Sequence, residues 1–157
     1  MTKTTLNAGE LRRVLIYVAE EIRKEEAALN ALDSAVGDGD HGITMRLGFD
    51  AVKAMLERED ETATISSIFA STGQAFISST GGAIGVIMGK MFLSSAAALR
   101  GVFDFGAPEL KMSLVAMETA VGAVGKAKPG DKTILDAILR SIWQKPTGLV
   151  CTVLPDH

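Results

Sequence analysis

The sequence has a single cysteine, Cys151, and few aromatic residues. One cysteine excludes an internal disulfide and fits a reducing compartment. Aromatic residues make up 5% of the chain, whereas hydrophobic residues make up 47%. The core must therefore consist largely of Ala, Leu, Ile, Val and Met, which favours closely packed helices.

The chain also lacks a basic stripe and an obvious targeting or membrane segment. Its formal net charge is −3, and the absence of clustered Lys and Arg argues against a nucleic-acid partner. Residues 1–7 lack the apolar core of a signal peptide. The longest weakly polar stretch, residues 81–98, is interrupted by Lys90 and contains four glycines. We therefore expect a soluble cytoplasmic protein with no membrane partner.

Apolar residues recur at three- and four-residue steps along most of the chain, which predicts an all-α antiparallel helix bundle. A length of 157 residues fits one domain spanning 1–157. Asn7 and Glu10 form a capping-box pattern at the start of the first helix. The charged residues of that helix are interpreted as a solvated face. The predicted helices cover residues 7–31, 41–58, 64–78, 83–100 and 108–124, and a last one begins near Thr133.

The stretch 32–45 combines carboxylates with turn-forming residues and directly precedes His41. Glycines let the backbone fold tightly, which brings carboxylates from different positions together. Carboxylates forced together repel each other unless a counter-charge is present. Because Mg²⁺ and Ca²⁺ prefer oxygen ligands, the stretch predicts a divalent metal site. The aspartates are Asp33, Asp38 and Asp40, and the interleaved glycines are Gly37, Gly39 and Gly42.

Three other motifs share features with this stretch. A plain polar loop needs no metal and stays open as an alternative. A dinucleotide fingerprint should follow a strand, whereas a helical pattern precedes this stretch. An EF-hand loop starting at Asp38 would need an oxygen ligand, a glycine and a glutamate where Gly42, Ile43 and Phe49 stand. The remaining hypothesis is an acidic metal loop that holds phosphate through the metal, with Asp40 as both ligand and helix cap.

Two further loops are rich in small or polar residues. Residues 78–83 carry hydroxyl groups and glycines, and a simple inter-helix turn stays open there. Residues 125–134 approach the P-loop pattern, but Asp131 separates Gly130 from Lys132 and a helix precedes the loop. A P-loop is therefore excluded, and a turn that ends one helix at Gly125 and starts the next remains.

Three motifs resemble, in order and spacing, those of the DhaL or DAK2 family, the L subunit of dihydroxyacetone kinase. They are Leu-Asp-x-x-x-Gly-Asp-Gly-Asp-His-Gly at 32–42, Ser-x-Gly-Gly-Ala at 79–83 and Pro-Gly-Asp-Lys-Thr-x-Leu-Asp at 129–136. The resemblance covers about residues 7–140. It implies an all-helical bundle or barrel of the DhaL type, in which Asp33, Asp38 and Asp40 hold two Mg²⁺ ions that bridge the phosphates of ADP or ATP. The nucleotide contacts that it implies are His41, Gly42, Ile43, Thr44, Ser79, Thr80, Gly81, Gly82, Ala83, Gly125, Thr133 and Ile134.

The chain departs from the family pattern at two places. Ile84 stands where the family has a serine. Residues 141–157 match neither the family's last helices nor its nucleotide-clamping segment, which bears an arginine and an Asp-Pro-Gly stretch. We therefore expect the last helices to be missing and some apolar helix faces to be uncovered.

The resemblance implies a nucleotide-binding phosphotransferase subunit that phosphorylates dihydroxyacetone or a related short ketose. No base or nucleophile for a ketose is evident, so a separate substrate-binding K subunit is expected as partner. The residues do not distinguish consumption of ATP from recharging of a bound ADP by a phosphotransferase-system protein, and a homodimer stays open. The alternative is a non-catalytic regulatory protein of the same fold that binds a nucleotide or a partner.

Overall fold

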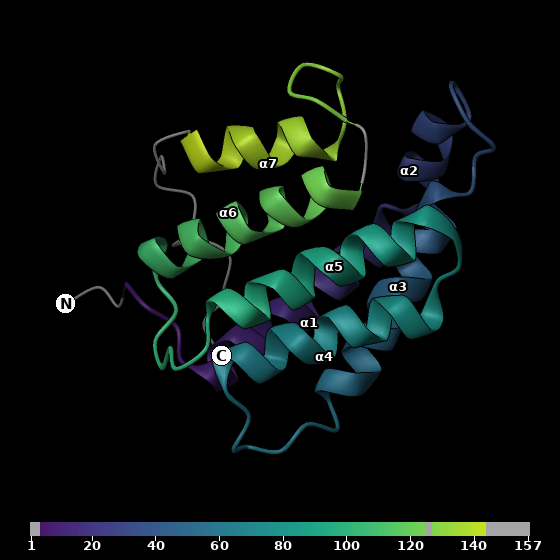
Figure 1. Cartoon of the computed structure of the whole chain (residues 1–157). Helices are drawn as coiled ribbons and strands as arrows, with labels where there is room; N and C mark the ends of the chain where they lie inside the picture. Colours follow the sequence, from purple (N-terminus) through teal and green to yellow (C-terminus); the bar gives the residue numbers. More distant parts are fainter. Residues whose placement is uncertain (1–3, 125–126, 144–157) are drawn as a thin grey trace.

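The computed structural model describes residues 4–124 and 127–143 and is built from helices (Figure 1). The described residues form no strand beyond one isolated bridge between Leu6 and Phe105. The predicted all-α fold is confirmed, and most helices begin and end within two residues of the predicted positions. The helices are α1 (Ala8–Lys24), α2 (Glu26–Asp33), α3 (His41–Leu56), α4 (Ile65–Ser79), α5 (Gly82–Ala98), α6 (Ala107–Val124) and α7 (Ile134–Trp143).

The prediction of one continuous helix over residues 7–31 is wrong. The chain turns at Glu25, where α1 ends and α2 begins. Neither proline nor glycine marks this turn, so no local signal predicts it. Its physical reason lies in contacts between α2 and α3, where Glu26 pairs with Arg46 and Asn30 accepts hydrogen bonds from the start of α3. The turn at Glu25 therefore lets α2 pack against α3.

The helices pack largely against their neighbours in the chain. α1 packs against α3, and further contacts join α3 to α4, α4 to α5, α5 to α6 and α6 to α7. Figure 1 shows α4 and α5 side by side in front of α1 and α3, with α6 and α7 above α5. The α2–α3 and α4–α5 connections lie toward the same end of the bundle in this view.

Phenylalanine rings join α3, α4 and α5 in the core. The ring of Phe76 meets Phe49 edge-on with centroids 5.0 Å apart and stacks on Phe92 at 6.0 Å. Gly48 lets α3 approach α4, since a Cβ there would lie 2.2 Å from the Phe76 ring. Aromatic pairs of this kind add to the stability gained by burial alone. The scarce aromatic residues are thus concentrated where the central helices meet.

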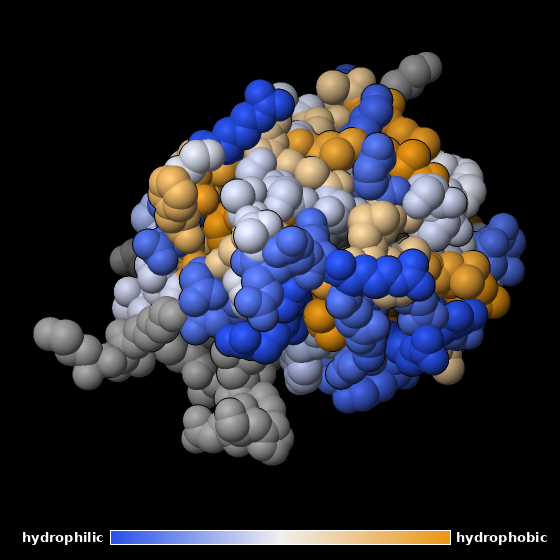
Figure 2. All heavy atoms as spheres, turned by 90° about the horizontal axis from the view of Figure 1, so that it is seen from below, coloured by the Kyte–Doolittle hydropathy of each residue, from blue (hydrophilic) through white to orange (hydrophobic). Residues whose placement is uncertain are grey.

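Charged side chains connect α1 to α3, so the interpretation of the α1 charges as a merely solvated face is wrong. Arg23 forms an ion pair with Asp50 at 2.8 Å, and Lys53 forms one with Glu20 at 2.5 Å. Figure 2 shows strongly hydrophilic residues over a broad part of the face seen from below. Exposed ion pairs contribute little stability individually. Here they connect the solvent-facing edges of α1 and α3.

The described helices include none with the length and apolarity needed to span a membrane. Residues 81–98, the most apolar stretch, form most of α5 and bury Met88, Met91 and Phe92. Exposed apolar side chains occur on α6 and α7, and also on α3, α4 and α5; they include Leu47, Ile77, Val86, Leu110, Met112 and Trp143. Exposed apolar side chains are thus spread over several of the described helices, and the expectation that particular apolar faces are left uncovered stays a prediction.

Candidate metal and nucleotide site

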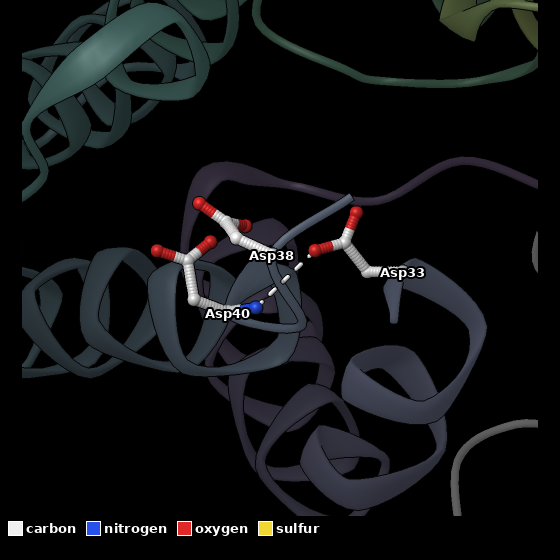
Figure 3. A group of neighbouring side chains, drawn as sticks. All are labelled: Asp33, Asp38 and Asp40. Carbon is white, nitrogen blue, oxygen red and sulfur yellow. Dashed lines mark hydrogen bonds between the residues drawn. The ribbon is translucent and has the colours of Figure 1, made fainter. Parts of the chain in front are cut away.

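The loop between α2 and α3 brings three carboxylates together. Asp33 is the last residue of α2, and Asp38 and Asp40 lie in the loop that leads to α3. One carboxylate oxygen from each of the three lies within 4.8 Å of the other two. Figure 3 shows the carboxylates of Asp38 and Asp40 side by side, with that of Asp33 across from them. The predicted convergence is present, and the role of these residues as metal ligands stays a prediction.

Asp33 also organises the loop that carries the other two aspartates. Its Oδ2 accepts hydrogen bonds from the backbone N–H group of Gly39 at 2.9 Å and from that of Asp40 at 3.2 Å, and Figure 3 shows the second of these. Gly39 has a φ of +79°, which a glycine adopts without steric cost. A Cβ at Gly37 would lie 2.7 Å from Asp33 Oδ1. The loop therefore folds closely around one carboxylate, which explains its glycines.

The three carboxylates repel one another. The pKa of Asp40 is raised above its ordinary value of 3.8, mainly by the charge of Asp38, then by desolvation, by a hydrogen bond with Asp38 and by the charge of Asp33. His41 acts in the opposite direction. A divalent cation would remove this repulsion, and hard oxygen donors are the ligands that Mg²⁺ and Ca²⁺ prefer. The donor set of the cluster therefore fits a hard divalent cation.

The start of α3 is capped by a residue that the sequence did not reveal. Asp40 makes no side-chain capping bond, and its φ and ψ of −109° and 0° differ from the extended conformation usual for a cap. Instead Asn30 Oδ1 accepts from the N–H groups of Gly42 at 2.7 Å and Ile43 at 3.2 Å. The predicted capping role of Asp40 is therefore wrong. A phosphate could meet the N–H groups of Gly42 and Ile43 only by displacing Asn30.

The α4–α5 connection exposes backbone next to hydroxyl groups. Ser79 Oγ and Thr80 Oγ1 donate to carbonyl groups of the preceding turn of α4 at 2.6 and 2.7 Å. Gly82 has a φ of +70°, and an added Cβ at Gly81 or Gly82 would meet nothing within 4 Å. Together with Ala83, the first residues of α5 therefore leave an open backbone surface at this end of the bundle.

An apolar pocket of about 380 Å³ lies between α3, α5 and α7. It brings His41, the neighbour of Asp40, together with Ile134, although 93 positions separate them in the sequence (134 − 41). Ile84, which the sequence analysis noted as a departure from the family pattern, lies in the same apolar wall. The pocket is lined by His41, Met45, Ile84, Ile87, Met88 and Ile134.

The loop before α7 is held by the carboxylate of Asp136, a role that the sequence pattern did not predict. Asp136 accepts hydrogen bonds from the N–H groups of Gly130 at 2.7 Å and Thr133 at 3.1 Å, and these bonds lower its pKa. Thr133 Oγ1 accepts from Leu135 N at 3.3 Å, in keeping with its predicted place at the start of a helix. Gly125, a predicted nucleotide contact, lies outside the described residues.

Removing Asp38 should stabilise the metal-free protein. Because the pKa of Asp40 is raised, repulsion by Asp38 costs stability above that pKa and is relieved as Asp40 becomes protonated toward pH 3.8. Asp38→Asn should therefore raise the melting temperature at neutral pH in EDTA, and the difference should shrink on acidification. Calorimetric melting at several pH values measures both effects.

The control for that experiment is Asp60→Asn. The pKa of Asp60 is lowered by hydrogen bonds from Thr62, so its ionised form is stabilised by folding and its replacement should not raise the melting temperature. A lower melting temperature of Asp38→Asn at neutral pH would contradict the repulsion inferred within the cluster.

Comparison with known proteins identifies a family and relatives that this chain resembles. Residues 35–144 match the DAK2 domain. The PEP-dependent dihydroxyacetone kinase 2, ADP-binding subunit DhaL, of Listeria innocua is 33% identical over 146 residues, which cover 90% of this chain and 66% of the relative. The corresponding ADP-binding subunit DhaL of Escherichia coli K12 is 36% identical over 112 residues, covering 71% and 53%.

A solved structure has the same fold. The crystal structure of the dihydroxyacetone kinase of C. freundii in its native form superposes with a TM-score of 0.71 at 25% identity, covering 90% of this chain and 26% of that one. The chain thus spans 66% or less of the length of the two relatives it was compared with above. The match to the DAK2 domain extends over more than half of the chain. The all-helical architecture of the chain agrees with the fold of that solved structure. The chain belongs to the DAK2 domain family.

Proposed function

We propose that this chain is the nucleotide-binding subunit of a kinase for dihydroxyacetone or a related short ketose, and that it binds ADP or ATP together with Mg²⁺. The observation that carries the proposal is the convergence of three carboxylates within 4.8 Å, next to an apolar pocket whose lining includes His41. The relatives named as ADP-binding subunits support it.

The proposed roles follow from the chemistry of each part of the site. Asp33, Asp38 and Asp40 would hold Mg²⁺, which would neutralise the charge of the phosphates. The open backbone of residues 79–83 would contact the phosphate chain. The pocket has a volume in the range usual for small-molecule sites, and its apolar walls would suit the flat face of a nucleobase.

The phosphoryl acceptor would come from a partner. Within the described residues, His41 is the one titratable side chain that lines the pocket, and it lies directly beside the carboxylate cluster. In the described part of the chain, the pocket thus offers no separate group that could bind and activate a ketose. We therefore propose that a substrate-binding K subunit presents the ketose to the nucleotide. Because the relatives are subunits of PEP-dependent kinases, we propose that the bound ADP is recharged by a phosphotransferase-system protein rather than exchanged.

Removal of the metal is the first test. Titration calorimetry with ADP should show binding in Mg²⁺, and the affinity should fall by about 100-fold or more in EDTA, since carboxylates and phosphates of like charge would then face each other. Adenosine, which lacks phosphates, is the control, and its weaker binding should not depend on Mg²⁺. An ADP affinity that is the same with Mg²⁺ and with EDTA would contradict the proposed site, and ADP that persists through dialysis would support the recharging mode.

A further inference from the structure

Two side chains of α2 hold the backbone that leads into α3. Asn30 and Asp33 are three residues apart and therefore lie on the same face of α2. Asp33 accepts from the N–H groups of Gly39 and Asp40, and Asn30 accepts from those of Gly42 and Ile43. The carboxylate-bearing loop and the first turn of α3 are thus attached to one short helix.

The start of α3 lies directly against α2 at this point. A Cβ at Gly42 would lie 2.1 Å from the carbonyl oxygen of Glu26 and 2.7 Å from Asn30 Oδ1. The carbonyl oxygen of Asn30 in turn accepts a hydrogen bond from Ser34 Oγ at 2.8 Å. Asn30 is half-buried, so water cannot easily replace it as the acceptor for α3.

A helix cap usually belongs to the residue just before the helix. Here the capping oxygen comes from another helix, 12 positions earlier in the chain. Its two hydrogen bonds therefore do more than satisfy the end of α3, because they fix where α3 begins relative to α2. Asp33 ends α2 and Asp40 precedes α3, so the same bonds set the distance between two of the clustered carboxylates.

We propose that Asn30 is a positioning residue of the cation site, which holds the start of α3 against α2 so that Asp40 meets Asp33 and Asp38. This inference rests on the proposed function. It assigns a share in the affinity for the metal to an uncharged residue whose side-chain oxygen accepts hydrogen bonds from the backbone of α3. Residues that orient metal ligands typically change metal affinity 10- to 100-fold when they are lost.

The test uses Mn²⁺ alone as the probe, without nucleotide, and follows its binding by electron paramagnetic resonance. Asn30→Ala should raise the dissociation constant for Mn²⁺ about tenfold or more. Asn30→Asp keeps an acceptor oxygen at the same position and should restore the affinity. The Mn²⁺ affinity of Asn30→Asp is compared with that of the wild type at high ionic strength, where the added negative charge is screened.

Asn7→Ala is the matched control. Asn7 also caps a helix through its side-chain oxygen, which accepts from Glu10 N at 2.9 Å, but that helix start is α1. Its loss should lower the melting temperature while leaving Mn²⁺ affinity unchanged. Asn30→Ala with a lowered melting temperature and wild-type Mn²⁺ affinity would overturn the proposal, because Asn30 would then be only a cap.

Two further outcomes are distinguishable. If Asn30→Ala does not fold, Asn30→Gln, which moves the amide by one methylene, carries the test, and wild-type Mn²⁺ affinity in that variant overturns the proposal. Absence of Mn²⁺ binding in the wild-type protein would overturn both this inference and the proposed function. Mn²⁺ binding by the wild-type protein combined with unaltered binding in Asn30→Ala, or in Asn30→Gln where Asn30→Ala does not fold, would remove the inference alone.

Discussion

Asp33→Ala is expected to abolish Mg²⁺-dependent ADP binding and to destabilise the α2–α3 loop at the same time. The substitution removes one of the three clustered carboxylates and also the acceptor of two backbone N–H groups, those of Gly39 and Asp40. Leaving backbone donors without a partner costs about 1–3 kcal/mol where water cannot replace the acceptor. We expect a loss of ADP affinity of about 100-fold or more, since the metal site loses a charged ligand. Calorimetry and urea unfolding measure the two effects separately.

Asp33→Asn separates the two roles of this side chain. The amide oxygen can still accept from Gly39 and Asp40, so the free energy of unfolding should stay close to that of the wild type. The negative charge is lost, so Mg²⁺–ADP binding should be lost with it. Asp60→Ala is the control, because it removes a carboxylate that accepts from Thr62 N elsewhere in the chain. Full Mg²⁺–ADP affinity in Asp33→Asn would mean that this aspartate serves the loop and not a metal.

Local patterns predicted the helices whose ends depend on nearby residues. The helix expected over 64–78 is Ile65–Ser79, with Thr64 and Ser67 forming a capping box. The turn at Glu25 was not predictable in this way, because it depends on contacts of α2 with α3. Periodicity reports which face of a helix is apolar, but not whether a long apolar pattern is bent by a neighbouring helix.

In the candidate site, too, features that depend on nearby residues could be predicted from the sequence, and features that depend on distant residues could not. The approach of Asp33, Asp38 and Asp40 could be predicted because they are close in sequence and glycines separate them. Asn30 was missed because its partners lie 12 and 13 positions away, and an asparagine within a helix gives no signal of a distant hydrogen bond. His41 and Ile134 were each expected to contact a nucleotide only because of the family resemblance, since no spacing rule connects α3 to α7; the structure shows that both line one pocket.

The carboxylate cluster costs the metal-free protein stability that the proposed cation would restore. Asp38 raises the pKa of Asp40, so the metal-free loop contains a repulsion that a cation would relieve. Asp33 offsets part of that cost through its hydrogen bonds to the loop backbone. Substitutions at Asp38 and Asp33 should therefore act oppositely on the metal-free protein, since Asp38→Asn stabilises it and Asp33→Ala destabilises it. Both should weaken the proposed metal binding.

Gly42→Ala should destabilise the protein and weaken the proposed site, because α3 cannot stay against α2 with a side chain at this position. The new Cβ would lie 2.1 Å from the carbonyl oxygen of Glu26, which is backbone and cannot rotate away. Overpacking of this kind costs about 1–3 kcal/mol, and the shift of α3 should also lengthen its hydrogen bonds to Asn30. Urea unfolding and Mn²⁺ binding are the measurements.

Gly122→Ala is the matched control for that substitution. Gly122 also lies within a helix, α6, but an added Cβ there would meet nothing within 4 Å. Alanine is the better helix former, so this variant should be more stable by up to about 1 kcal/mol. Both substitutions replace a glycine with alanine, but their effects on the free energy of unfolding should have opposite signs. Gly42 lies against α2, whereas Gly122 has open space around it. If Gly42→Ala were as stable as Gly122→Ala and bound Mn²⁺ like the wild type, the close approach of α2 and α3 could not be what holds the three carboxylates together.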